Sequence, residues 1–184
     1  MNEHELLTPD EIKSLIATVP NHPKPGVMFR DIMPLLSDAR GLRSVIGHLA
    51  KHYEDAEIDR IVGLEARGFL IATPLAAALG VGLVAARKPG KLPGKVVREK
   101  YQLEYGEDEL QIESGLIAPG MRVLVADDLL ATGGTALAAV ELCEKLRAQV
   151  VGCGFVVELP DLGGRARLEK MGQEVFSICE FRGE

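Results

Sequence analysis

The stretch that decides the fold runs from Val123 to Thr135 and reads V-L-V-A-D-D-L-L-A-T-G-G-T. Its apolar start predicts a buried strand over residues 123–126, and its end predicts the first turn of a helix. The glycine pair allows positive φ angles and a close approach of a ligand to the backbone. Because the first amides of a helix lack partners within it, this turn predicts a phosphate site. The residues expected to hold the phosphate are Ala131, Thr132, Gly133, Gly134 and Thr135.

Two carboxylates, Asp127 and Asp128, follow the predicted strand, in an expected loop over residues 127–134. Successive residues of a strand point to opposite faces, so these side chains are not arranged to share one proton unless the strand has already ended. They suit separate hydroxyl groups of a sugar. The whole stretch therefore predicts a ribose 5-phosphate site. A branched side chain at Gly133 would be expected to fill the space of the phosphate. The alternative is an ordinary capped loop with solvated aspartates.

Strands and helices alternate along the chain on both sides of this stretch. Short apolar runs predict further strands at 61–64, 83–86, 150–157 and 175–179, and alternating polarity predicts a hairpin at 99–113. Caps and helical spacing predict helices at 9–19, 42–53, 68–79, 134–146 and 163–170. This order predicts an α/β fold in a single domain over residues 1–184, with a central, mostly parallel sheet and helices on both faces. Ligands of such sheets bind beyond the carboxyl ends of the strands.

The composition is that of a globular protein, since 47% of the 184 residues are hydrophobic and 26% are charged. The net charge of -6 argues against a nucleic-acid partner. No apolar run reaches the ~18 residues of a membrane span, and the acidic start is unlike a secretory signal. The cysteines lack the spacing of a metal site or a disulfide framework. We therefore expect a cytoplasmic protein with neither a nucleic-acid nor a membrane partner.

Positive charge gathers at two predicted strand ends. Arg67 and Gly68 follow the strand at 61–64, where a guanidinium beside helix amides suits a pyrophosphate. A basic segment rich in proline and glycine follows the strand at 83–86 and is expected to form a lid over the pyrophosphate. The alternative is a solvated charged surface, which is the usual meaning of a charge run. The cations of the basic segment are Arg87, Lys88, Lys91, Lys95 and Arg98.

The stretch at 123–135 resembles the phosphoribosyl-pyrophosphate signature of the type I phosphoribosyltransferases, and its L-L-A-T-G-G-T part is similar to the adenine-specific branch of that family. The similarity covers nearly the whole chain. Residues 25–32 resemble the base-side segment, residues 63–69 the pyrophosphate loop, and residues 87–93 and 101–106 the mobile catalytic loop and the strand behind it. Some members have Asp-Ser where this chain has Glu65-Ala66, which excludes a side-chain role at Ala66.

The resemblance implies roles for further residues. Adenine would stack on Phe29, with backbone groups of Met28 and Arg30 reading its edge and Leu159 as the opposite wall; the alternative for Phe29 is an ordinary core position. Residues 1–35 would form a hood over the base, and the peptide bond between Glu65 and Ala66 would be cis. The pyrophosphate and lid residues implied are Glu65, Ala66, Arg67, Gly68, Arg87, Lys88, Lys91 and Tyr105.

The reaction implied is the transfer of a 5-phosphoribosyl group from phosphoribosyl pyrophosphate (PRPP) to adenine, giving AMP and pyrophosphate, as in purine salvage. Arg67 would stabilise the leaving group and Glu104 would accept a proton from the base. Since no dedicated metal site is evident, Mg²⁺ is expected to bind through PRPP near Asp127 and Asp128. The resemblance alone implies a homodimer. Two alternatives stay open, transfer to a 6-oxopurine and a non-catalytic nucleotide-sensing regulator on the same fold.

Overall fold

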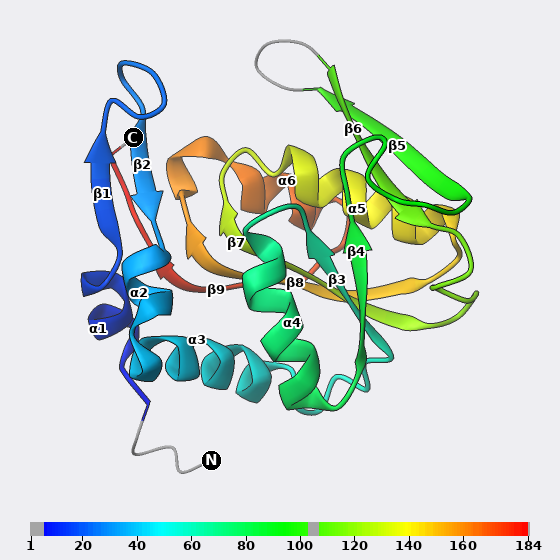
Figure 1. Cartoon of the computed structure of the whole chain (residues 1–184), viewed down its shortest axis with the longest axis horizontal. Coiled ribbons are helices and arrows are strands. Elements are labelled where there is room, and N and C mark those ends of the chain that lie inside the picture. Colours follow the sequence, from blue (N-terminus) through cyan, green and yellow to red (C-terminus); the bar gives the residue numbers. More distant parts are fainter. Residues whose placement is uncertain (1–5, 103–106, 184) are drawn as a thin grey trace.

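The computed structural model describes residues 6–102 and 107–183, which form alternating strands and helices (Figure 1). No helix within these two ranges is long and apolar enough to cross a bilayer. The strands are β1 Ala17–Pro20, β2 Met28–Asp31, β3 Arg60–Leu64, β4 Gly82–Ala86, β5 Val96–Gln102, β6 Glu107–Glu113, β7 Arg122–Leu130, β8 Gln149–Glu158 and β9 Val175–Glu180. The helices are α1 Pro9–Ser14, α2 Met33–Ser37, α3 Ala39–His52, α4 Gly68–Leu79, α5 Gly134–Lys145 and α6 Gly164–Lys170.

A five-stranded parallel sheet forms the centre of the molecule, in the order β4-β3-β7-β8-β9 (Figure 1). Successive residues of its strands face opposite sides: Ile61 and Leu124 join the apolar cluster that includes α3 and α4. Val62 and Val125 join the cluster that includes α5. Helices therefore cover both faces, which confirms the expected α/β fold. Because the strands are parallel, their carboxyl ends share one edge, where the loops after β3, β4, β7 and β8 meet.

Two antiparallel pairs of strands flank this sheet. The pair β5–β6 is the expected hairpin, and it packs against α5. Arg87 and Gln111 exchange two backbone hydrogen bonds of 2.8 Å, which attach the hairpin to the end of β4. The pair β1–β2 lies beside α1 and β9, within the segment expected to form the hood (Figure 1).

The first helix begins where the sequence indicates but ends earlier. Thr8 and Glu11 form the expected capping box, in which Thr8 Oγ1 accepts the Glu11 amide at 3.3 Å and the Glu11 carboxylate accepts the Thr8 amide at 2.8 Å. The prediction that the helix continues to Val19 is wrong, since α1 ends at Ser14 and residues 17–20 form β1. Val19 pairs with Phe29, a long-range partner that helical spacing does not reveal.

Strand β7 is longer than its apolar start. The predicted loop at 127–134 is wrong in its first half, because β7 continues through Asp127 and Asp128 to Leu130. The neighbouring β8 supports this extension: Leu130 pairs with Glu158, and the Leu159 amide donates to the Leu130 carbonyl at 2.9 Å. Both carboxylates therefore sit on a paired strand rather than in a turn.

Candidate active site

A small cavity lies where β7 passes into α5. Its volume is about 90 Å³, which suits a phosphate group rather than a base. All the residues expected to hold a phosphate line this cavity, and Asp127 lines it as well. We call it the phosphate cavity; its lining residues are Asp127, Leu129, Leu130, Ala131, Thr132, Gly133, Gly134, Thr135, Ala136 and Phe155.

Gly133 has the positive φ angle that the sequence indicates, and it also lies against α6, which the sequence does not reveal. Its φ angle is +80°, in the left-handed region that favours glycine. A Cβ at this position would lie 3.1 Å from the Cα and 3.2 Å from the carbonyl oxygen of Gly164, at the start of α6. A side chain at this position would therefore push against α6, and the expectation that a branched one would fill the phosphate space stays a prediction.

Asp127 and Asp128 have different surroundings. Asp127 accepts the Asp128 amide at 2.8 Å, and it lies so close to α4 that a Cβ at Gly68 would be 2.5 Å from its Oδ1. Burial and the adjacent charge of Asp128 raise the pKa of Asp127. Asp128 is 4% exposed, and its Oδ2 lies 3.0 Å from Nη2 of Arg67. Burial also raises the pKa of Asp128, although Arg67 acts to lower it.

Arg67 stands between the sugar side and the base side of the site. Besides its ion pair with Asp128, its Nη1 lies 3.5 Å from the Arg30 carbonyl oxygen, and its Cζ lies 4.9 Å from the centre of the Phe29 ring. The sequence indicates a position beside the pyrophosphate. In the structure, Arg67 contacts the groups expected to hold adenine and ribose, and its role at the pyrophosphate stays a prediction.

A second cavity of about 400 Å³, the base cavity, lies beside β2. It unites all four residues expected to hold adenine and adds two that the sequence interpretation missed, Leu129 and Leu162. Leu129 lies within the motif itself, so alternation along β7 was the signal that could have indicated it. The lining residues are Gly26, Val27, Met28, Phe29, Arg30, Arg67, Leu129, Ala131, Leu159 and Leu162.

The side chain of Arg30 contacts two residues that do not line the base cavity. Its Nη1 donates to Thr18 Oγ1 at 2.6 Å, and its guanidinium lies 4.5 Å from the centre of the Phe181 ring. The backbone of Arg30 therefore remains the part that is suited to read a base. Phe29 is only partly buried and is not a core residue; it meets His22 edge to face at 4.9 Å.

The basic segment is held by carboxylates of the protein. Arg87 Nε lies 3.2 Å from Oε2 of Glu65, and the same oxygen accepts the Lys88 amide at 2.9 Å. Burial acts to raise the pKa of Glu65, but these bonds hold it below its ordinary value. The Lys88 ammonium pairs with Asp108 and donates to the Tyr101 hydroxyl at 2.7 Å. Two of the expected lid cations thus have internal partners.

The remaining predictions have mixed outcomes. The peptide bond between Glu65 and Ala66 is cis, as the resemblance implies. Lys91 is exposed, and its carbonyl oxygen accepts Nη1 of Arg87 at 3.3 Å. Lys95 and Arg98 are exposed before and within β5. Glu104 and Tyr105 lie outside the described residues, so their roles stay predictions.

The carboxylates at the end of β7 suit a metal ion that arrives with a substrate. In the described part of the chain, no group of three or more His, Cys, Asp or Glu side chains is arranged to hold a metal. Mg²⁺ at nucleotide sites is usually held by one or two carboxylates together with substrate phosphates. Asp127 at the phosphate cavity, with Asp128 beside it, fits this second arrangement.

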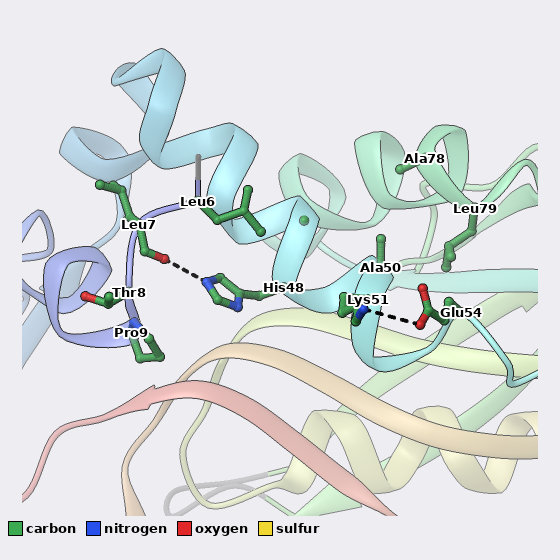
Figure 2. Close-up of a pocket in the computed structure, with 11 residues that line it drawn as sticks. Leu6, Leu7, Thr8, Pro9, His48, Ala50, Lys51, Glu54, Ala78 and Leu79 are labelled. Atoms are coloured by element: carbon green, nitrogen blue, oxygen red, sulfur yellow. Dashed lines mark hydrogen bonds and ion pairs between the residues drawn. The ribbon is translucent and has the colours of Figure 1, made fainter. Parts of the chain in front are cut away.

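A larger cavity, of about 720 Å³, lies between the N-terminal segment, α3 and the end of α4 (Figure 2). In its wall, His48 Nε2 donates to the Leu7 carbonyl oxygen at 2.7 Å. Leu79 lines it from the carboxyl end of α4, roughly 18 Å along the helix from Arg67 at 1.5 Å per residue. None of the residues expected in the site lines this cavity, so its size alone does not make it the functional site.

Comparison with known proteins identifies the family. Residues 35–178 match the phosphoribosyl transferase domain. The adenine phosphoribosyltransferase of Methylobacillus flagellatus is 52% identical over 170 residues, which cover 92% of this chain and 97% of the relative. The crystal structure of the Thermoanaerobacter pseudethanolicus enzyme has a TM-score of 0.91 and 45% identity, covering 95% of this chain and 100% of that one. The Saccharomyces cerevisiae enzyme has a TM-score of 0.86 and 41% identity, covering 92% and 97%. This chain therefore belongs to the adenine phosphoribosyltransferase family.

Proposed function

We propose that this protein transfers the 5-phosphoribosyl group of PRPP to adenine and releases AMP and pyrophosphate, a reaction of purine salvage. The observation that carries the proposal is a shared wall: Leu129 and Ala131 line both the base cavity and the phosphate cavity. A molecule that joins a base to a phosphate through a sugar can span both, and AMP has this shape. The structure of the yeast relative contains adenine and an imino-altritol bisphosphate.

On the base side, the purine ring is proposed to stack on Phe29, in the cavity that Leu129 and Leu159 also line. Adenine presents a donor, its 6-amino group, beside an acceptor, N1. The backbone of an extended strand offers the matching acceptor and donor, and Met28 and Arg30 supply them from β2.

On the sugar side, the amides of the loop at 131–133 and of the first turn of α5 hold the 5′-phosphate. Asp127 and Asp128 accept hydrogen bonds from the ribose hydroxyls. Opening of the ion pair between Asp128 and Arg67 frees both carboxylate oxygens and the guanidinium. Arg67 then binds the pyrophosphate through paired N–H donors.

In the reaction, a bond forms between N9 of adenine and C1′ of the ribose, while the bond from C1′ to the pyrophosphate oxygen breaks. The bonding electrons leave with the pyrophosphate, so negative charge grows on the leaving group. Arg67, Arg87 and Lys88 stabilise that charge, and Lys91 and Tyr105 are proposed to complete the lid. The ring proton of adenine leaves from N7, and Glu104 is proposed to accept it. Mg²⁺ bound through PRPP would neutralise part of the pyrophosphate charge.

We also propose a homodimer in the cytoplasm. Leu70 on α4 and Leu83 on the edge strand β4 are 44% and 38% exposed, and apolar side chains of this kind are suited to contact with a second copy. The cysteines Cys143, Cys153 and Cys179 are free and buried, which suits a reducing compartment. Burial raises their pKa values to about 12, about 12 and about 11, so they are unreactive thiols. Sedimentation equilibrium tests the dimer.

The deciding experiment offers PRPP and Mg²⁺ with adenine, hypoxanthine, guanine or xanthine in separate reactions and measures each nucleotide product. We expect AMP from adenine, and no turnover when a chelator is in excess. Faster turnover of hypoxanthine contradicts the substrate assignment, and full turnover with chelator contradicts the need for Mg²⁺. No turnover with any base would favour a nucleotide-sensing regulator.

A further inference from the structure

We infer that Arg167, a residue of α6 outside both cavities, is a positioning residue for the 5′-phosphate of the substrate. It holds the Thr132 carbonyl and so turns a loop amide toward the phosphate cavity. The inference rests on the proposed function, because it requires a phosphorylated substrate in that cavity.

Helix α6 donates hydrogen bonds to two consecutive carbonyl oxygens of the phosphate loop, those of Ala131 and Thr132. The Arg167 guanidinium donates from Nη1 to the Thr132 carbonyl oxygen at 2.6 Å. The Gly164 amide, at the start of the helix, donates to the Ala131 carbonyl oxygen at 3.1 Å. Gly133 leaves no room for a side chain on this side, since a Cβ there would lie 3.1 Å from the Gly164 Cα. The loop is therefore bonded to α6 at two successive residues, Ala131 and Thr132.

The directions of the loop amides follow from these bonds. In the described part of the chain, the cis peptide bonds are His22-Pro23 and Glu65-Ala66, so the peptides around Thr132 are trans. In a trans peptide, C=O and N–H point in opposite directions. Since the carbonyls of Ala131 and Thr132 point at α6, the amides of Thr132 and Gly133 point away from it.

The side away from α6 is the side of the phosphate cavity. Among the described residues, none of α6 lines that cavity, whereas Thr132 and Gly133 both do. Within the same residues, neither of these two amides donates to a protein acceptor. A buried amide without a partner is costly, and an anion at this place satisfies it. A hydrogen bond to the carbonyl also polarises the peptide and strengthens the amide as a donor.

Helix α6 is itself anchored to the sheet, so it can hold the loop in place. Arg165 Nε donates to both carboxylate oxygens of Glu158, at 2.9 and 3.2 Å, and Nη1 donates to the Val175 carbonyl at 2.7 Å. Glu158 is 2% exposed, and Ser177 donates to it at 2.7 Å. Arg165 therefore fixes the helix, whereas the exposed Arg167 reaches the loop.

The test compares Arg167→Met with Lys170→Met, which removes an equal charge from an exposed position of the same helix. For Arg167→Met, we expect the Kd of AMP and the KM of PRPP to rise about tenfold, the size of one hydrogen bond to a charged group. The KM of adenine and the melting temperature should not change. Lys170→Met should leave all four quantities near their original values, and Arg167→Lys should recover part of the AMP affinity.

A second readout separates positioning from simple attraction between charges. In the absence of nucleotide, Arg167→Met should shift the ¹⁵N resonance of the Gly133 amide, whose peptide carbonyl it releases, and Lys170→Met should not. The inference is overturned if AMP affinity is the same in both Met variants, or if it falls while the Gly133 resonance stays fixed. If the unmodified protein does not bind AMP, the proposed function fails instead, and the Gly133 resonance still reports whether Arg167 sets the peptide.

Discussion

The phosphate loop at 131–133 and the basic segment at 87–98 are proposed to grip two ends of one substrate, and they are built in opposite ways. The loop has no charged side chain, and its carbonyls are held by Gly164 and Arg167 of α6. The basic segment relies on charged side chains, and its first two cations are paired with Glu65 and Asp108.

This difference indicates which ligands each region should bind. Amides that are already oriented need no rearrangement when an anion arrives, so the loop should act on every ligand with a 5′-phosphate. The cations must exchange a protein carboxylate for a phosphate, so the basic segment should act only when a pyrophosphate is present. AMP and PRPP therefore report on the two regions separately.

The largest effect is expected from Gly133→Val in the phosphate loop. A branched residue at φ +80° is strained, and its Cβ would meet Gly164 at 3.1 Å. We expect calorimetry to show no AMP binding, a loss beyond about 100-fold. The matched control is Gly120→Val, which has φ +84° and open space around the Cβ. Equal AMP affinity in the two variants would mean that the loop does not bind the phosphate.

The next largest effect is expected from Glu104→Gln, which tests the proton transfer. Glutamine keeps the size of the side chain but cannot take up a proton, so kcat should fall by roughly 10²–10⁴-fold. Glu104→Leu should be worse, and the affinity for PRPP should barely move in either variant. Single-turnover kinetics isolate the chemical step, and a Gln variant with most of its rate there would leave Glu104 at most a positioning role.

A smaller effect is expected from Arg87→Met in the basic segment. Its guanidinium is proposed to move from Glu65 to the pyrophosphate, so the KM of PRPP should rise about tenfold while the Kd of AMP stays the same. Lys170→Met removes an exposed cation from α6, outside the basic segment, and is the control. The contrast between the two regions is contradicted if Arg87→Met raises the Kd of AMP as much as it raises the KM of PRPP.

The smallest effect is a gain in stability for Asp127→Asn. Burial raises the folded-state pKa of Asp127, so the folded protein loses stability as the pH rises through that pKa. Asparagine still accepts the Asp128 amide and cannot ionise. Thermal unfolding should show a higher melting temperature near pH 7.5, with the gain vanishing towards pH 4. AMP affinity should fall, because the ribose loses a carboxylate; a variant less stable at pH 7.5 contradicts the assignment.

The sequence by itself determined the features that depend on neighbouring residues. The apolar run at 123–126 and the glycine pair at 133–134 predict a strand that leads into a helix, and both are confirmed. The capping box at Thr8 and the helix over residues 68–79 are likewise local patterns. Alternating strands and helices were sufficient to predict the parallel sheet, because the choice of layers follows from hydrophobic periodicity.

Only the tertiary structure decided which distant groups meet. The pairing of Val19 with Phe29 replaces a helical turn by a strand, and pairing with β8 extends β7 through both aspartates. Arg67 reaches Asp128 and Arg30, which lie 61 and 37 positions away, and Arg167 reaches Thr132 across 35 positions. These contacts depend on how helices and loops pack over the sheet, and no local pattern in the chain specifies that packing.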